Sequence, residues 1–498
     1  MLKTAALVAG SALGKVLGVA RDLALAYFLG ASVAADAFRV SLTAALVPTS
    51  FFMGDVLDGA FVPLYSRYLR SNRASARRLL MLTGAYLLAV SVALVGVIWV
   101  AGRLLVRTFA PGLVAQTVAL ATAMTHLMGL GIPFYCLAAL LGLYGLCHNR
   151  FRPLALRSVF QNAGLVLILP VAAWLRSPAL LGAGFAAAYV VYLVFVLWDL
   201  RGTGLLVPEG GEAEGRELVN MFTTVVPLLW LMLLGQILGM VDRASASFVG
   251  TGAIASLEYA RVFTETPNVL VGTAVASTSL ARFATLGSDD VPGRASGLVV
   301  PLMSGVVVVS LVLVAAAPDL VTAFYQRGRF DAHASIMVAG ALRGLAPGAP
   351  FLVGSYILQR VLYAQFRSRE VIGPMLTTVA VAVAANVVLM PRLGLLGVGL
   401  GMSIAYVIFC GILAARVGIL QPLTERVPGW AIASALAVGV ALVGHAFPGP
   451  AAVRTVVVGA ASGVAAVVGI GVWAGSRADL LVLRDQVAGL VGTVAGRL

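Results

Sequence analysis

The sequence predicts an all-α polytopic membrane protein with 14 transmembrane helices, arranged as two parallel six-helix repeats followed by two C-terminal helices. Three observations predict this fold class: the apolar composition, the spacing of apolar runs, and an internal repeat of charged residues. Of the 498 residues, 60% are hydrophobic and 11% are charged, and the mean hydropathy is +1.00. Soluble domains carry about 25% charged residues, so this composition indicates a chain embedded in lipid. At about 35 residues for each span and its connection, the length accommodates roughly 14 helices and leaves little room for an extramembrane domain.

Apolar runs of about 20 residues, separated by short segments with Gly, Pro and Arg, predict the individual spans. The first run continues past Lys15 and Arg21 to Gly30, so we interpret it as a span and not as a signal peptide. The predicted spans are 4–29, 33–64, 79–102, 113–147, 154–175, 179–198, 218–247, 253–281, 295–323, 334–364, 371–391, 394–415, 428–446 and 455–475.

The positive charges predict the orientation of the chain in the membrane. The sequence has 34 Lys plus Arg against 20 Asp plus Glu, for a net charge of +14. With Arg157 in the first turn of span 154–175 counted with the adjoining loop, 20 of these cations fall outside the spans on the side of the N-terminus and seven on the other side. Cytoplasmic loops are enriched in Lys and Arg, so we expect both termini in the cytoplasm. The enrichment of cytoplasmic loops in Lys and Arg therefore explains the net positive charge without a nucleic-acid partner.

An internal repeat predicts the domain organisation. Adding 222 to the residue number takes Arg21 to Arg243, Asp36 to Glu258 and Arg39 to Arg261, so the charged pair of spans 1 and 2 recurs in spans 7 and 8. Transporters are often built from such repeats, with the substrate site near mid-membrane. The predicted domains are an N-lobe (1–202, spans 1–6), a cytoplasmic linker (203–217), a C-lobe (218–420, spans 7–12), spans 13–14 (421–476) and a cytoplasmic amphipathic tail (477–498).

Seven cations lie inside predicted spans, and the repeated ones define a candidate substrate-binding site. A charge at a lipid-facing helix centre costs about 2.5–3.5 kcal/mol, so these groups should face a polar cavity or a partner charge. Such a cavity would attract an anion, and phosphate or diphosphate suits the arginine fork. The alternative is that each ion pair only fixes helix register. The candidate residues are Lys15, Arg21, Asp22, Asp36, Arg39, Asp242, Arg243, Glu258, Arg261 and Glu265; Arg343 and Arg360 are the remaining cations inside spans.

The sequence offers no pattern for a metal, a cofactor or a catalytic residue. The three cysteines and four histidines are scattered without ligand spacing, and no phosphate-binding loop for ATP is present. A membrane enzyme that acts on lipid-linked glycans would be expected to have a substantial outward loop, whereas the outward loops predicted here have about a dozen residues at most. We therefore expect a transporter.

An ordered series of short motifs resembles the MurJ/MviN lipid II flippases of the MOP exporter superfamily, over about residues 5 to 420. The matching motifs are 16–22 (VLGVARD), 28–31 (FLGA), 35–38 (ADAF), 59–63 (GAFVP), 149–151 (NRF) with Pro153 and Asn162, 241–243 (VDR) with Ala246 and Ser247, Tyr259–Ala260, 324–330 (FYQRGRF) and 393–397.

This resemblance implies a bacterial inner-membrane exporter with two six-helix lobes, which moves undecaprenyl-diphosphate-linked glycan precursors outward by alternating access. It also implies a groove for the lipid tail on the last two helices. The family's functional cations correspond to Lys15, where the family usually has Arg, and to Arg21, and its acidic residue in span 2 corresponds to Asp36.

Three departures from the family pattern stand in spans 2 and 8. Thr49–Ser50 replace an Arg–Arg pair, Gly54 replaces an acidic residue with Asp55 beside it, and Arg261 comes one residue earlier than the family's cation. These departures bear more on the identity of the cargo than on the flippase mechanism.

We therefore predict a flippase, without a cofactor, for an undecaprenyl-diphosphate-linked precursor of peptidoglycan. It would act through a cationic central cavity in the cytoplasmic membrane, with membrane lipids around it. A coupling ion and cell-wall synthesis proteins are further candidate partners. The alternatives are, in descending order, a flippase for an exopolysaccharide or O-antigen unit on the same lipid, a small-molecule antiporter, a membrane-embedded glycan enzyme and a scaffold.

Overall fold

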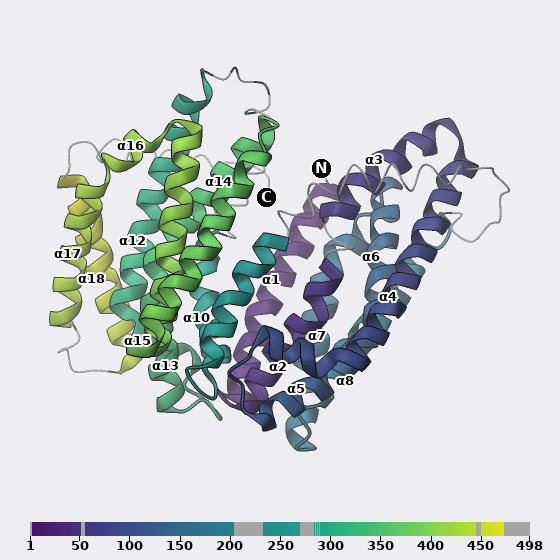
Figure 1. Cartoon of the computed structure of the whole chain (residues 1–498), viewed down its shortest axis with the longest axis horizontal. Coiled ribbons are helices and arrows are strands. Elements are labelled where there is room, and N and C mark those ends of the chain that lie inside the picture. Colours follow the sequence, from purple (N-terminus) through teal and green to yellow (C-terminus); the bar gives the residue numbers. More distant parts are fainter. Residues whose placement is uncertain are drawn as a thin grey trace. The chain divides into compact units, whose positions relative to one another are not determined.

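The computed structural model is helical throughout the part of the chain that it describes, which is residues 2–50, 55–203, 233–268, 283, 285, 287, 289–444 and 450–472 (Figure 1). The all-α fold class is thus confirmed. The predicted tail (477–498), most of the linker (203–217) and Gly54 lie outside the described residues.

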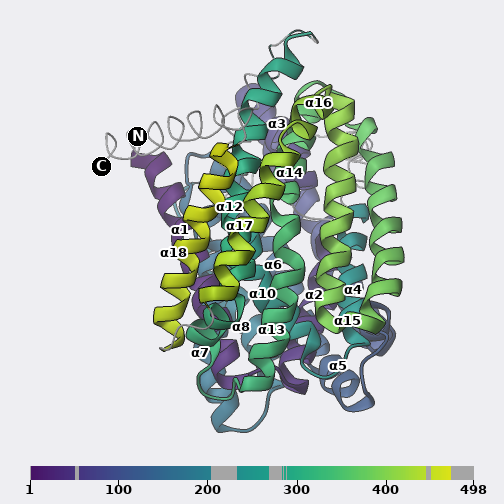
Figure 2. The same cartoon turned by 90° about the vertical axis from the view of Figure 1, so that its left-hand side faces the viewer.

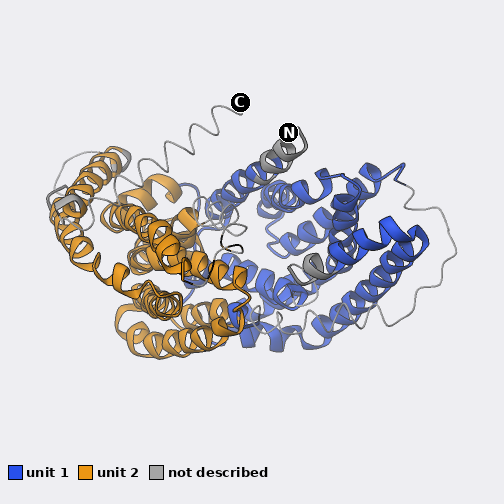
Figure 3. Cartoon of the chain, turned by 90° about the horizontal axis from the view of Figure 1, so that it is seen from above, with its two compact units in different colours: residues 1–236, 250–255, 327–330 blue, residues 237–249, 256–326, 331–498 orange. Residues whose placement is uncertain are grey.

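The chain divides into two compact units, coloured separately in Figure 3. Unit 1 comprises residues 1–236, 250–255 and 327–330, and unit 2 comprises residues 237–249, 256–326 and 331–498. Two short segments from the second half of the sequence therefore belong to unit 1.

Unit 1 is built around the packing of its first helix against α7 and of α2 against α5. Its helices are α1 (Leu2–Leu29), α2 (Val33–Ser50), α3 (Asp55–Ser71), α4 (Arg73–Phe109), α5 (Ala115–Gly129), α6 (Ile132–Cys147), α7 (Arg152–Trp174) and α8 (Leu180–Asp199). The predicted span 33–64 covers α2 and the first part of α3, and α4 extends beyond the predicted 79–102 at both ends.

Unit 2 continues from a helical segment at residues 233–247 into a set of long helices. These helices are α10 (Ala253–Pro267), α12 (Val291–Tyr325), α13 (Ala332–Leu345), the short 3₁₀ helix η2 (Ala346–Gly348), α14 (Ala349–Ala364), α15 (Arg369–Val417), α16 (Leu420–Thr424), α17 (Val427–Gly444) and α18 (Ala451–Val472). Gly394 has a non-helical backbone inside α15 and divides it at the boundary between the predicted spans 371–391 and 394–415. The first three residues of α10 belong to unit 1.

The two units repeat the same order of helices. A shift of 217 residues takes α6 onto α14, which has the same length of 16 residues, and takes the start of α7 at Arg152 onto the start of α15 at Arg369. The same shift takes α4 to within one residue of α12 at each end. The motifs of spans 1 and 2 need a shift of 222, so unit 1 has five more residues between α2 and α4 than unit 2 has at the equivalent point.

Each repeat contains one interrupted span. In unit 1, α5 and α6 form a broken span with a bend of 44°. In unit 2, the 3₁₀ helix η2 interrupts the equivalent run between α13 and α14. The second helix of each run has proline in its first turn, at Pro133 and Pro350. Proline has no backbone N–H group, and the N–H groups of the first helical turn have no acceptor within the helix. Proline at this position therefore starts a new helix at little cost.

The last two helices pack on each other and on α12 (Figures 1 and 2). Arg454 of α18 binds Asp319 of α12 through Nη2 and Nε, at 2.7 and 3.0 Å from the same carboxylate oxygen. In the first half of α12, Ser304 Oγ accepts a hydrogen bond from Trp430 Nε1 of α17 at 3.0 Å. These polar contacts fix the register of α17 and α18 on α12.

Eight helices in the described part of the chain are long and apolar enough to cross a membrane, or nine with the bent α5–α6 pair. The charged helices α1, α2 and α10 are not among them. The total of 14 spans stays a prediction.

Candidate functional site: two arginine–carboxylate clusters

In unit 1, α1 and α2 bring two arginines to one carboxylate, and α7 adds an amide. We call Arg21, Asp22, Arg39 and Asn162 the unit 1 cluster. Asp22 Oδ1 accepts hydrogen bonds from Arg21 Nη2 at 3.0 Å and from Arg39 Nη2 at 2.9 Å. The side chains of Arg21, Asp22 and Arg39 are only 16%, 9% and 8% exposed. Two guanidinium groups and one carboxylate leave this cluster with a formal charge of +1.

The close packing of α1 on α7 orients Arg21. A side chain at Gly10 or Gly14 would collide with Ala155 or Ser158 of α7, so glycine is required for this approach. One turn further along α7, Asn162 donates to the Gly14 carbonyl oxygen at 3.0 Å and accepts from Arg21 Nη1 at 3.1 Å. Glycine at these two positions therefore serves the packing of α1 on α7.

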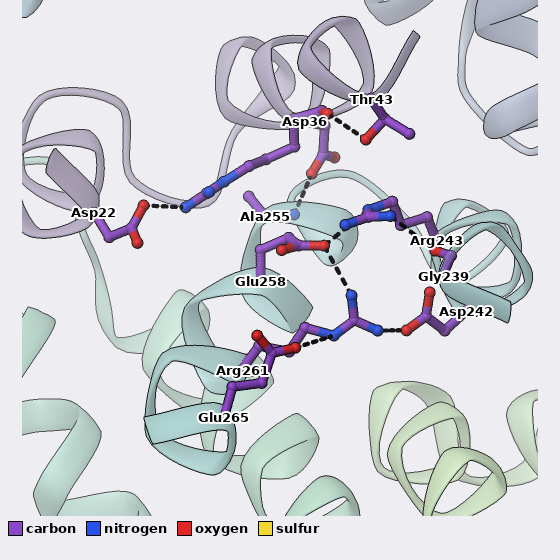
Figure 4. A network of polar contacts seen from close by, with 11 residues as sticks. Asp22, Asp36, Thr43, Gly239, Asp242, Arg243, Ala255, Glu258, Arg261 and Glu265 are labelled. Carbon is purple, nitrogen blue, oxygen red and sulfur yellow. Dashed lines mark hydrogen bonds and ion pairs between the residues drawn. The ribbon is translucent and has the colours of Figure 1, made fainter. Parts of the chain in front are cut away.

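Asp36 does not join the unit 1 cluster, although it lies one turn from Arg39. It is fully buried, and its two oxygens accept hydrogen bonds from the backbone amides of Gly252 at 2.5 Å and Ala255 at 2.8 Å, at the start of α10 (Figure 4). Exposed amides at a helix N-terminus stabilise a carboxylate. Asp36 thus holds the segment 250–255 within unit 1.

In unit 2, the equivalent arginines are surrounded by three carboxylates. We call Asp242, Arg243, Glu258, Arg261 and Glu265 the unit 2 cluster (Figure 4). Glu258 Oε1 lies 2.9 Å from Arg243 Nε and 3.2 Å from Arg261 Nη1, so the two arginines again share one oxygen. Arg261 also contacts the fully buried Asp242 and, at 3.9 Å, the more exposed Glu265. The formal charge of this cluster is −1.

The structure brings eight of the ten predicted site residues into these two clusters. Glu258, Arg261 and Glu265 interact at the helical spacing that the sequence indicates. Asp242 contacts Arg261 of the next helix, whereas its neighbour Arg243 contacts Glu258. Lys15 is exposed, and no ion pair involves it among the described residues.

The described residues that depart from the family pattern form hydrogen bonds or ion pairs with nearby groups. Thr49 and Ser50 donate their hydroxyl hydrogens to carbonyl oxygens three residues earlier, at 2.6 and 2.7 Å. Arg261 joins the unit 2 cluster despite its position one residue early. Within the described ranges, no group of three or more His, Cys, Asp or Glu is arranged to hold a metal ion.

Sequence reasoning missed Asn162 and Asp319 as partners of arginines. Asn162 is one of the motif residues, but nothing in its local spacing indicates a contact with Arg21, which lies 141 residues away. Asp319 and Arg454 are 135 residues apart. The only signal was that a buried polar residue in an apolar helix needs a partner.

Comparisons with known proteins identify the family to which the chain is similar. The family model described as lipid II flippase MurJ matches residues 25–449. A lipid II flippase MurJ of Burkholderia cenocepacia is 27% identical over 459 residues, which is 86% of this chain and 86% of that protein. A probable lipid II flippase MurJ of Rhizobium tropici is 27% identical over 429 residues, covering 80% of this chain and 77% of that protein.

Solved structures share the fold. A structure of lipid II flippase MurJ in an inward closed conformation has a TM-score of 0.78 at 17% identity, over 94% of this chain and 98% of that one. An inward-facing MATE family transporter of the MOP superfamily has a TM-score of 0.64 at 15% identity, over 82% of this chain and 95% of that one. Since the family match extends over most of the sequence, the chain belongs to the lipid II flippase MurJ family.

Proposed function

We propose that this protein moves lipid II from the cytoplasmic to the outer leaflet of the bacterial cytoplasmic membrane, by alternating access. The observation that carries the proposal is the match of residues 25–449 to the lipid II flippase family. Lipid II is an undecaprenyl-diphosphate-linked glycan, so its transporter must accommodate an anionic head group while the tail stays in lipid.

In this proposal the unit 1 cluster is the principal contact for the diphosphate. Arg21 and Arg39 share the carboxylate of Asp22, so these three residues together carry a formal charge of +1 in a largely buried setting. A low dielectric strengthens the attraction of such a charge for an anion, and guanidinium binds phosphate oxygens in pairs. Lys15, exposed on the same helix, adds a second cation along α1.

The unit 2 cluster has a different electrostatic role. Arg243 and Arg261 already have three carboxylate partners. We propose that they contact the substrate less strongly and mainly fix α10 against the preceding helix. This assignment keeps both arginines in the candidate site but ranks them below Arg21 and Arg39.

The membrane potential is the proposed driving force. With both termini in the cytoplasm, outward movement of an anion is favoured by about 2.3 kcal/mol per charge per 100 mV. This requires no ATP and no coupling ion. The enzymes that make lipid II would act on its cytoplasmic side and those that polymerise it on its outer side.

Reconstitution into proteoliposomes tests the function. Lipid II is placed in the inner leaflet, an inside-negative potential is imposed in sodium-free buffer, and head-group exposure on the outside is measured. Exposure that depends on the protein and on the potential supports the proposal, whereas exposure at the rate of empty liposomes contradicts it. Arg21→Ala should abolish both this exposure and growth in flippase-depleted cells, at unchanged protein levels in the membrane.

An exopolysaccharide or O-antigen unit on the same lipid is the alternative cargo. It draws on the replacement of the family's Arg–Arg pair in span 2 by Thr49 and Ser50, whose hydroxyl groups donate to carbonyl oxygens of their own helix. Parallel reconstitutions with lipid II and with such a unit discriminate between the two: faster exposure of the second cargo would favour the alternative.

A further inference from the structure

The helix α14 carries a polar face inside an apolar span. Tyr356, Gln359, Arg360 and Tyr363 follow one another at steps of three, one and three residues, which places them on one side of the helix, and all four are half-buried. We call these four residues the α14 polar face. They lie within a stretch, Ala332–Ala364, that is long and apolar enough to cross a membrane.

The four side chains contact one another in pairs. Arg360 Nη2 donates to the Tyr356 hydroxyl oxygen at 3.3 Å, and the guanidinium carbon lies 5.3 Å from the centre of the Tyr356 ring. Tyr363 donates to Gln359 Oε1 at 3.4 Å. These contacts present a cation, an amide and two aromatic rings on one surface.

The opposite side of α14 packs inside unit 2. A side chain at Gly354 would collide with Met303 of α12 and Cys410 of α15. Tyr356 and Tyr363 are two and nine residues further on, which is about half a turn away from Gly354 on the helix. The α14 polar face therefore points away from the α12 and α15 residues that Gly354 contacts.

The equivalent helix of unit 1 has no such face. A shift of 217 residues takes the four positions onto Ala139, Gly142, Leu143 and Leu146 of α6, all apolar and the first three buried. The two helices have the same length and the same N-terminal proline. The fold thus forms this helix without a polar face, so a requirement of folding does not explain Arg360.

Charge identifies the kind of ligand that fits the α14 polar face. Among the described residues, no acidic side chain forms an ion pair with Arg360, in contrast to Arg243 and Arg261 in the same unit. An arginine within a span is costly unless it faces water or a partner of opposite charge. A ligand that fits the α14 polar face therefore carries an anionic group next to a polar, uncharged surface that tyrosine and glutamine can contact.

We propose that the α14 polar face binds the head group of the lipid-linked substrate, with Arg360 contacting an anionic oxygen and Tyr356, Gln359 and Tyr363 contacting the sugar. This inference rests on the proposed function. The anionic oxygen belongs either to the diphosphate or to a carboxylate of the sugar–peptide part.

Equilibrium binding to purified protein in nanodiscs tests the proposal. The ligands are lipid II and undecaprenyl diphosphate without the glycan, and the variants are Arg360→Gln, Arg360→Lys and the matched control Arg392→Gln, an exposed arginine of α15. Arg360→Gln should weaken lipid II binding about tenfold, since one charge-assisted contact is lost, and Arg360→Lys should weaken it less. Arg392→Gln should bind as the wild type does.

The two ligands distinguish the sources of the anionic oxygen. Equal losses for both ligands in Arg360→Gln assign the contact to the diphosphate, and a loss for lipid II alone assigns it to the sugar–peptide part. Wild-type affinity of Arg360→Gln for lipid II, or an equal loss in the Arg392→Gln control, overturns the inference while wild-type transport stands. If the wild type neither binds nor exposes lipid II, the proposed function fails and this inference fails with it.

Discussion

The two arginine clusters use the same arrangement with opposite net charge. In each unit, an arginine on one helix and an arginine on the next share one carboxylate oxygen, Asp22 Oδ1 in unit 1 and Glu258 Oε1 in unit 2. The shared acid comes from the first helix in unit 1 and from the second in unit 2. Unit 2 has Asp242 and Glu265 in addition, so the formal charge of its cluster is −1 instead of +1.

This difference separates two roles that the sequence repeat alone assigns together. A cluster in which two cations share one carboxylate keeps a positive formal charge and attracts an anion. A cluster with three carboxylates tolerates the loss of one, and its negative formal charge does not attract an anionic substrate. The following variants test whether the two clusters differ in this way.

The largest effect on stability is expected for Asp22→Asn. It removes the carboxylate that Arg21 and Arg39 share, and removing one partner of a buried ion pair costs about 3–5 kcal/mol. Chemical denaturation in detergent should show this loss in the free energy of unfolding. A loss below about 1 kcal/mol would mean that the unit 1 cluster is more hydrated than its burial indicates.

Asp242→Asn should cost less, about 2 kcal/mol, although Asp242 is fully buried. Arg261 retains Glu258 and Glu265 as partners in this variant. The same denaturation experiment measures the difference. A larger loss for Asp242→Asn than for Asp22→Asn would reverse the comparison.

Asn162→Ala should reduce stability by about 1 kcal/mol and slow head-group exposure by a few-fold. The variant removes one partner of Arg21 and one contact between α7 and α1. Gln161→Ala is the matched control, because Gln161 accepts a hydrogen bond from Tyr189 and, within the described ranges, forms no hydrogen bond with the unit 1 cluster. Equal transport by the two variants would show that Asn162 does not orient Arg21.

The smallest effect is expected for Glu265→Gln. The Glu265 side chain is 55% exposed and lies 3.9 Å from Arg261, so this ion pair is screened by solvent. The change in the free energy of unfolding should stay below about 0.5 kcal/mol. A change above 1 kcal/mol would indicate that Glu265 is an integral member of the unit 2 cluster.

Much of the fold and part of the candidate site followed from the sequence. Apolar runs gave the helical class, and the shift of 222 residues anticipated that Arg21 and Arg39 have counterparts in Arg243 and Arg261. Contacts at helical spacing, such as that of Glu258 with Arg261, are local and can be read from the chain.

Contacts between distant segments were not predictable in this way. The sequence pairs Asp36 with Arg39 by spacing, but the carboxylate binds backbone amides more than 210 residues later, at the start of α10. Backbone amides leave no residue signature. Apolar composition continues through the breaks between α5 and α6 and between α13 and α14, and the local sequence signal for these breaks is Pro133 and Pro350.

The most direct test of the central claim is the affinity of undecaprenyl diphosphate for the wild type, Arg21→Gln and Arg243→Gln, measured on the same preparation in nanodiscs. If the surplus positive charge of the unit 1 cluster receives the diphosphate, Arg21→Gln weakens binding by about tenfold or more and Arg243→Gln by threefold at most. An equal or larger loss in Arg243→Gln would contradict the account.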